Sequence, residues 1–403
     1  MWSREPNERS VFAWLLSPHT IEEFASWYYE RAPLLVSRSS PDYYRRCFNL
    51  TELERVLYGS EVDSEDLRVV KNGTPARPET YLREGSRRVD ADRVSALFAH
   101  GCTVVLDKVQ AYSGPVLELC RGLEVCLRHR VNANLYLTPS GSQGFAAHYD
   151  THDTVILQVE GAKHWRVYGA PVEVPLLAQK HDKKKHLAGE VEIDVVLRPG
   201  DLLYLPRGVM HEAVCTDEFS LHVTLGLHPI LWIDVLEEAA KRGGLDEAML
   251  RRSAAEVELA GGAGGEALSE AIGRTFSPQR LLETLQDLRS SWVVQRRNVL
   301  DGQLRQLVSL ASLTPDSRLA LRAHLLYELR EDEAGTQLLF SGKVVRLPRW
   351  AAAMIRDLAA VPSLEVAVLA RYGAEAPAVA RRLVEEGFAV RVESQMPARA
   401  LVR

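Results

Sequence analysis

The sequence predicts an α+β protein with a jelly-roll β-sandwich at its centre and helical regions on both sides. Between residues 100 and 230, short runs of β-branched and aromatic residues are separated by Gly, Pro and Asp. Many short strands at regular spacing are typical of a sandwich or jelly roll. Before and after this stretch, apolar residues recur at helical spacing. Because 403 residues are too many for one ordinary core, we expect two or three domains.

The composition is that of a soluble globular protein. Apolar residues make up 46% and charged residues 26%, and the net charge of −5 gives no general attraction to nucleic acid or anionic membranes. The N-terminal segment is charged where a signal peptide needs an apolar core, and no apolar run reaches the roughly 18 residues that span a bilayer. We therefore expect a cytoplasmic protein. An odd number of cysteines without a C-x-x-C pair favours reduced thiols over a disulfide framework: Cys47, Cys102, Cys120, Cys126 and Cys215.

The predicted first domain, residues 1–230, joins N-terminal helices to the sandwich. Residues 10–60 are predicted to be helical, and one helix opens with Thr20 as N-cap and a Glu three residues later, which is a capping box. Inside the sandwich, the charged segment from Lys180 to His186 is predicted to be a solvated loop. A binding tract is the alternative for this segment.

After Trp232 the pattern becomes helical again, and residues 231–310 are predicted to form a helical region. Ser277 is the expected cap of a helix with Pro278 at its first position. The Gly-rich segment 260–267 is predicted to be a loop, because it lacks the preceding strand and the spacing of a phosphate-binding motif.

Residues 311–403 alternate between strand and helix patterns, which suits a small winged-helix domain. From residue 316 onward there are 13 Arg and Lys against 11 Asp and Glu, so the basic stripe of a DNA-binding domain is missing. We expect this domain to contact protein rather than DNA.

Three residues have the pattern of a metal site: His148, Asp150 and His211. A His-x-Asp pair on a strand places both side chains on one face, because strand residues alternate with period two. His211 follows a strand bracketed by the turns PGD (199–201) and PRG (206–208), an arrangement that brings a distant ligand alongside. Any one of these histidines could instead be structural. His152 shares the parity of His148 and is a competing candidate.

Two histidines and one carboxylate leave three positions open on an octahedral metal. This suits non-haem Fe(II), which must hold a co-substrate and O₂. Zinc would be satisfied by four ligands.

Lys163 is predicted to point into the sandwich, on the same face as Trp165 and Val167. A buried lysine needs an anion, and a dicarboxylate such as 2-oxoglutarate could chelate iron at one end and meet Lys163 at the other. Alternatively, Lys163 reaches solvent beside the turn at residues 160–161. On the preceding strand one face is polar, and it either orients the co-substrate or is an edge wetted by solvent: Asn132, Asn134, Tyr136 and Thr138.

The segments NANLYLTPSGSQGFAAHYDTHDTVILQVEGAKHWRVY and RPGDLLYLPRGVMHEA resemble the ribosomal oxygenases, which are JmjC-type, cupin-like hydroxylases that depend on 2-oxoglutarate and act on large-subunit ribosomal proteins. The resemblance implies a double-stranded β-helix catalytic domain, a helical dimerisation region that makes a homodimer, and a winged helix. It also implies Fe(II) and O₂ chemistry on the β-carbon of Arg (bacterial members) or His (animal members). The residues it assigns are His148, Asp150 and His211 for iron, Lys163 for the distal carboxylate, and Asn134 and Tyr136 for the pocket.

Two other functions stay open at this point. The same chemistry could act on a peptide natural product or another protein, because the motifs do not encode the substrate. The chain could also be a non-enzymatic regulator, a cupin that carries a winged helix. The charged loop and the small residues of FAAHYD and HVTLGLHP depart from the family pattern at positions associated with substrate.

Overall fold

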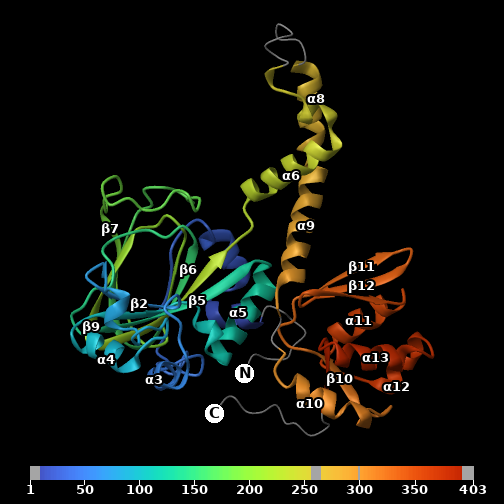
Figure 1. The fold of residues 1–403 in the computed structure, drawn as a ribbon, viewed down its shortest axis with the longest axis horizontal. Helices are drawn as coiled ribbons and strands as arrows, with labels where there is room; N and C mark the ends of the chain where they lie inside the picture. The colour runs from blue at the N-terminus through green and yellow to red at the C-terminus, as the bar shows by residue number, and fades with distance from the viewer. Residues whose placement is uncertain (1–9, 256–264, 298–299, 393–403) are drawn as a thin grey trace. The chain divides into compact units, whose positions relative to one another are not determined.

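The computed structural model describes residues 10–255, 265–297 and 300–392. The chain divides into two compact units, the first ending at His228 and the second beginning at Pro229. Figure 1 shows both units, and each is described by itself. Among the described residues, no helix is both long and apolar enough to cross a bilayer.

The first unit begins with short helices, as the sequence predicts. Thr20 Oγ1 accepts a hydrogen bond from the backbone N–H of Glu23 (3.1 Å), and the Glu23 carboxylate accepts one from the N–H of Thr20 (2.9 Å), so the capping box is confirmed. The expectation of helix throughout residues 10–60 is wrong at β1, Leu34–Val36. This segment follows Pro33, which cannot continue a helix, and it pairs with β8 at one end of the sheet.

The first unit contains these elements: helices α1 (Ser10–Leu16), α2 (Ile21–Glu23), α3 (Leu50–Gly59), α4 (Ala91–Ala99) and α5 (Gly114–Leu127), single turns at Phe24–Tyr28, Pro78–Thr80 and Val109–Ala111, and strands β1, β2 (Leu67–Lys71), β3 (Thr74–Pro75), β4 (Thr103–Leu106), β5 (Arg130–Pro139), β6 (Asp153–Tyr168), β7 (Val191–Leu197), β8 (Leu202–Leu205) and β9 (His211–His228).

Within the described residues these strands form one antiparallel system in the order β1-β8-β6-β9-β5-β4-β2-β3, with β7 also paired to β6. The long strands β6 and β9 pair along almost their whole length. The first half of β6 pairs with β8 on its other side, and the second half pairs with β7. The two halves therefore belong to different layers, which makes the jelly roll.

The bend between the halves of β6 lies at Gly161. Its φ of +62° is unfavourable for other residues, and a Cβ at this position would overlap with the carbonyl oxygen of Phe219. The Gln158 side chain donates to the carbonyls of Glu160 (2.9 Å) and Gly161 (3.2 Å), so it satisfies backbone groups that the ladder leaves unpaired.

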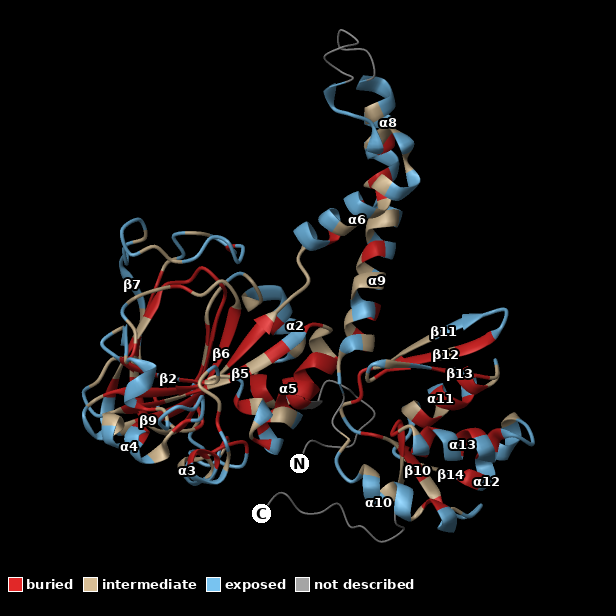
Figure 2. Cartoon of the chain, in the orientation of Figure 1, coloured by how far each residue is buried: buried red, intermediate tan, exposed pale blue. Residues whose placement is uncertain are grey.

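The core of the first unit lies between the sheet and the helices α1, α3 and α5. Figure 2 shows the buried residues concentrated along β5, β6 and α5. Leu135, Val223 and Leu225 of adjacent strands are at most 2% exposed. The five cysteines are thiols, and all except Cys126 are buried.

The second unit opens with helices. Ser277 is the N-cap of α9 and Pro278 lies in its first turn, as predicted. The predicted Gly-rich loop falls at 260–264 outside the described residues, and its last residues, 265–267, begin helix α8 instead of a loop. The elements are α6 (Trp232–Asp246), a turn at Ala248–Arg251, α8 (Gly265–Thr275), α9 (Pro278–Gln295), α10 (Gln303–Val308) and a turn at Leu310–Ser312.

The remainder of the second unit mixes strands and helices around one apolar cluster that includes Phe340, Ile355 and Phe388. Two three-stranded antiparallel sheets are present, β14-β10-β15 and β11-β12-β13. The winged-helix identity stays a prediction. The elements are β10 (Arg318–Leu321), β11 (Glu328–Asp332), β12 (Gly335–Phe340), β13 (Lys343–Leu347), α11 (Ala351–Ala360), β14 (Leu364–Glu365), α12 (Val366–Leu369), a turn at Ala370–Tyr372, α13 (Ala376–Glu385) and β15 (Ala389–Val392).

Candidate metal centre and co-substrate pocket

The three predicted metal ligands lie together at one end of the β6–β9 ladder. His148 forms an isolated antiparallel bridge with His211, the first residue of β9, through backbone hydrogen bonds of 3.1 and 2.8 Å. The ligand atoms of His148, Asp150 and His211 all lie within 4.8 Å of one another. Of the residues that the structure describes, this is the one such group of His, Cys, Asp and Glu.

Both histidine rings are oriented by their own backbone. The Nδ1 atom of His148 lies 2.8 Å from the carbonyl oxygen of Ala146, and that of His211 lies 3.1 Å from the carbonyl of Val209. When Nδ1 is protonated and donates to this carbonyl, the lone pair of Nε2 in each ring is free to bind a metal. His211 Nε2 lies 3.9 Å from Asp150 Oδ2.

The charges of His211 and Asp150 suit a divalent cation. Burial, together with the neighbouring His148, lowers the pKa of His211 to about 4, so the ring is neutral at pH 7. Burial alone would raise the pKa of Asp150, but His211, His152, His148 and Arg68 lower it below its ordinary value. A neutral imidazole and an ionised carboxylate are the protonation states that metal binding requires. The donor set therefore fits a metal such as Fe(II).

A buried charge network, which the sequence reading missed, connects the two segments that carry the ligands. Asp153, fully buried, accepts hydrogen bonds from the backbone N–H (2.9 Å) and guanidinium (3.2 Å) of Arg207 and from the hydroxyl of Tyr204 (3.1 Å). Arg207 also donates to the carboxylate of Glu30 at 2.5 Å. The motif PRG indicated only a turn, because a sequence does not show which acid its arginine meets.

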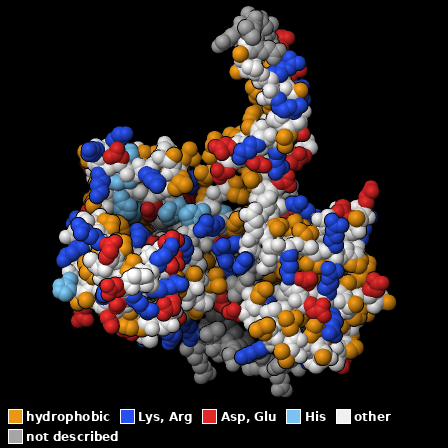
Figure 3. Space-filling model, viewed as in Figure 1, with side chains coloured by type: hydrophobic (Ala, Val, Ile, Leu, Met, Phe, Trp, Pro, Cys, Tyr) orange, Lys and Arg blue, Asp and Glu red, His pale blue; other side chains and the backbone are white. Residues whose placement is uncertain are grey.

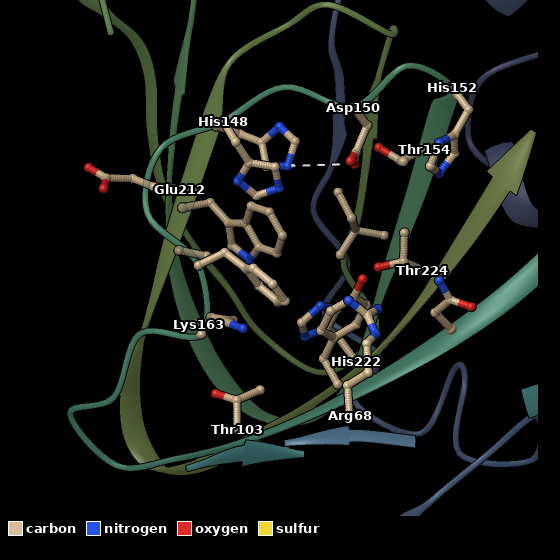
Figure 4. Close-up of a pocket in the computed structure, with 18 residues that line it drawn as sticks. Arg68, Thr103, His148, Asp150, His152, Thr154, Lys163, Glu212, His222 and Thr224 are labelled. Atoms are coloured by element: carbon tan, nitrogen blue, oxygen red, sulfur yellow. Dashed lines mark ion pairs between the residues drawn. The ribbon is translucent and has the colours of Figure 1, made fainter. Parts of the chain in front are cut away.

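A cavity of about 310 Å³ extends from the ligands into the sandwich. On the surface of the first unit, histidine side chains gather around a hollow (Figure 3). Figure 4 shows His148 and Asp150 at one end of the cavity, and Lys163 and His222 toward the other. The lining residues are Arg68, Thr103, Asn134, Tyr136, Gly144, Phe145, His148, Asp150, His152, Thr154, Ile156, Lys163, Trp165, His211, Glu212, Ala213, His222 and Thr224.

Lys163 points into this cavity and is only 4% exposed. Trp165 and Val167 are buried on the same face of β6, as the sequence reading expected. Lys163 Nζ donates to Thr138 Oγ1 at 3.1 Å. Burial lowers the pKa of Lys163 to about 8. The alternative, in which this lysine reaches solvent beside the turn, does not hold.

The polar face of β5 is also internal. β5 lies between β4 and β9, so the alternative of an edge strand wetted by solvent is wrong. Asn134 and Tyr136 line the cavity. Asn134 Oδ1 accepts a hydrogen bond from the backbone N–H of Lys108 (3.1 Å), and burial raises the pKa of Tyr136 to about 12. Asn132 belongs to this face but is not a lining residue.

His152, the competing ligand candidate, lines the cavity but lies outside the group of three. Its ring stacks on that of His228, with centroids 4.9 Å apart. The absence of a side chain at Gly226 makes room for it, because a Cβ there would lie 2.9 Å from the His152 ring.

Two lining residues, Arg68 and His222, had no predicted role. Arg68 comes from β2, and its guanidinium donates to both carboxylate oxygens of Asp107 (2.5 and 2.7 Å). His222 lies opposite Tyr136 in the β5–β9 ladder, and the two rings stack with centroids 4.8 Å apart. Their inward orientation depends on the register of strands distant in sequence.

The charged loop combines an exposed and a packed part. Lys183, Lys184 and Lys185 are exposed, as expected of a solvated loop. His181 and His186 instead pack against the ring of Tyr149, with centroids 5.4 and 5.3 Å away. The loop is thus attached to the residue between two candidate ligands.

The comparisons with known proteins agree with the site. Residues 115–234 match the JmjC domain family. Ribosomal oxygenase 1 of Gallus gallus is 37% identical over 258 residues, which are 62% of this chain and 43% of that protein. Bifunctional lysine-specific demethylase and histidyl-hydroxylase NO66 of Aedes aegypti is 34% identical over 233 residues, 57% of this chain and 36% of that one. The chain thus spans about two fifths of the length of these curated relatives.

Solved structures extend the likeness of the fold to most of the chain. The crystal structure of Escherichia coli ribosomal oxygenase YcfD has a TM-score of 0.53 at 17% identity, over 93% of this chain and 98% of that one. YcfD in complex with cobalt and 2-oxoglutarate has a TM-score of 0.52 at 17% identity, over 93% of this chain and 99% of that one. These matches confirm the predicted cupin-like jelly roll accompanied by helices. The chain is thus similar to ribosomal oxygenases over more than half of its length, and residues 115–234 match the JmjC domain family.

Proposed function

We propose that this protein is an Fe(II)- and 2-oxoglutarate-dependent dioxygenase that hydroxylates an unactivated carbon in a protein side chain. One observation carries the proposal: a cavity with two histidines and an aspartate at one end and a buried lysine toward the other. The structure of the distantly similar YcfD in complex with cobalt and 2-oxoglutarate supports a metal and the same co-substrate.

The residues divide into two sets with different tasks. His148, Asp150 and His211 would hold Fe(II), which together with 2-oxoglutarate and O₂ supplies the oxidising power for C–H hydroxylation. Lys163 neutralises the distal carboxylate of 2-oxoglutarate, and Thr138 fixes the position of its ammonium group. Asn134 and Tyr136 form the adjoining wall.

The charges in the cavity favour histidine over arginine as the residue that is hydroxylated on its β-carbon. Besides Asp150, the acid among the lining residues is Glu212. Its carboxylate already accepts hydrogen bonds from the Tyr168 hydroxyl (2.7 Å) and the Gln143 amide (3.0 Å). A guanidinium would enter beside Arg68 without a free carboxylate, whereas a neutral imidazole needs none. The name of the Aedes aegypti relative also includes a histidyl-hydroxylase.

A large-subunit ribosomal protein is the proposed substrate, with arginine hydroxylation or another protein or peptide as the alternative. We also propose a cytoplasmic homodimer formed through residues 231–310, a winged helix that contacts protein, and no direct DNA binding. Trp232 and Ile233 of α6 are 61% and 41% exposed, which supports a contact in this helical region. The intact ligand set and the buried Lys163 count against a non-enzymatic regulator.

Anaerobic visible absorbance tests the chemistry. The protein with Fe(II) and 2-oxoglutarate should develop the weak charge-transfer band of the chelated 2-oxo acid, and O₂ should abolish it. His211→Ala should show no band. If metal binds but no band forms, the 2-oxoglutarate reaction is excluded. Mass spectrometry of ribosomal proteins incubated with the enzyme then tests the substrate, and a mass gain of one oxygen on histidine is expected.

A further inference from the structure

Three nitrogen donors on the wall of the cavity have spare hydrogen-bonding capacity. Lys163, Trp165 and His222 are 4%, 5% and 2% exposed. Trp165 Nε1 and His222 Nδ1 have no hydrogen-bond partner among the described residues. The Lys163 ammonium has three hydrogens, and it donates one to the hydroxyl of Thr138.

The three side chains are neighbours. Lys163 Nζ lies 5.8 Å from the centre of the Trp165 ring, and the rings of Trp165 and His222 meet edge to face with centroids 5.6 Å apart. On its other side, Trp165 lies 6.0 Å from the ring of His211, a candidate metal ligand. These donors therefore line the path from the metal centre to the buried lysine.

The acids that line the cavity do not supply the missing acceptor. The acids among the lining residues are Asp150, which belongs to the metal ligands, and Glu212, whose oxygens are already engaged. Burial, followed by the charge of Lys163, lowers the pKa of His222 well below its ordinary value, so this ring is neutral and has one N–H to donate. Buried donors without partners are unfavourable, so their retention indicates a ligand that satisfies them.

We propose that Trp165 and His222 donate their N–H groups to the distal carboxylate of the co-substrate, beside Lys163. This inference rests on the proposed function and extends it. The two donors would make the cavity selective for a dicarboxylate over a 2-oxo acid of equal length that lacks the second carboxylate. Tyr136, which stacks on His222, would fix the orientation of its ring.

The test compares the binding of 2-oxoglutarate and 2-oxopentanoate to the full chain loaded with Mn(II), measured by anaerobic titration calorimetry without turnover. His222→Phe keeps a ring on Tyr136 and removes both nitrogens, and Trp165→Phe removes the indole N–H. Each variant should lower the affinity for 2-oxoglutarate about tenfold, as expected for the loss of a hydrogen bond to a charged group. The affinity for 2-oxopentanoate should stay within about twofold, because that ligand has no distal carboxylate to lose a bond. His222→Gln, which keeps an N–H donor, should recover most of the affinity.

The outcomes distinguish a failure of this inference from a failure of the proposed function. If the wild type prefers 2-oxoglutarate strongly and both Phe variants retain that preference, the donors serve only buried water or the neighbouring Gln158, and the inference is overturned. Equal weakening of both 2-oxo acids would indicate a structural role and would also overturn it. If the metal-loaded wild type binds neither ligand, the proposed function itself falls. Because 2-oxopentanoate binds through the metal centre, its unchanged affinity also controls for misfolding.

Discussion

The buried lysine should destabilise the protein when no ligand is bound. Burial holds the pKa of Lys163 at about 8, against an ordinary value of 10.5. Each pKa unit corresponds to about 1.36 kcal/mol, so keeping the ammonium charged in the cavity at pH 7 costs about 3 kcal/mol. Lys163→Met has a similar length and no charge. It should therefore stabilise the ligand-free protein by about 2 kcal/mol, after the lost hydrogen bond to Thr138 is subtracted.

Urea unfolding of the metal-free and ligand-free protein measures this difference. The midpoint of the first unit's transition should rise in Lys163→Met with an unchanged m-value, since a changed m-value would indicate a different folded or unfolded state. The pH dependence supplies an independent check. Between pH 8 and 10.5 the unfolded state binds more protons at this lysine than the folded state, so wild-type stability should rise with pH in that window. Lys163→Met should lack this contribution to the rise.

Ligand binding should reverse the order of the two proteins. Saturating 2-oxoglutarate and Mn(II) should stabilise the wild type more than Lys163→Met, because the distal carboxylate neutralises the ammonium only in the wild type. A decrease of more than about 1 kcal/mol in the stability of ligand-free Lys163→Met would refute the reasoning, since it would mean that the protein already compensates the buried charge.

Substitutions at three further positions test how the site is held. Gly161→Val should destabilise the first unit by more than about 2 kcal/mol in urea unfolding, because φ is positive and a Cβ would overlap with the Phe219 carbonyl; an unchanged midpoint would contradict this. Asp153→Ala removes a carboxylate from buried Arg207 and should cost about 3 kcal/mol in the same assay, with weakened Mn(II) binding by calorimetry. Thr138→Val should lower 2-oxoglutarate affinity about threefold to tenfold, whereas Thr138→Ser should stay near wild type.

The metal ligands could be predicted from the sequence because their signal is local. His148 and Asp150 are two residues apart, and His211 follows two turns that mark the end of a strand. The predicted strand for the first pair is wrong, because both residues precede β6 and only His148 forms a β-bridge. The inward orientation of Lys163 can also be predicted from its neighbours in the sequence, because Trp165, two residues later, identifies the buried face. The structure brings these residues to one cavity.

The residues whose positions the sequence does not predict are placed by contacts between segments that are distant in the chain. Arg68 reaches the cavity from β2, whose place in the sheet follows from its pairing with β4. Asp153 and Arg207 are 54 residues apart and meet only when the turn before β9 packs on the start of β6. The sequence predicts helix at the strand Leu34–Val36, because its partner β8 is 166 or more residues away in the chain. In each case the deciding interaction is tertiary.

Simple alternation along β6 and β9 does not predict all the residues that line the pocket, because the face that points into the cavity changes along the strands. In the first half of β6 the lining residues are even-numbered, Thr154 and Ile156, and in the second half they are odd-numbered, Lys163 and Trp165. The register shifts between Gln158 and Lys163 produce this exchange, because each extra residue turns the following side chains to the other face. β9 also contributes from both sides of the bend; its lining residues are His211, Glu212 and Ala213 before it and His222 and Thr224 after it. The bend at Gly161 therefore has a functional consequence. It allows His222 and Thr224, which lie on the other side of the bend from Lys163 and His211, to face the same cavity.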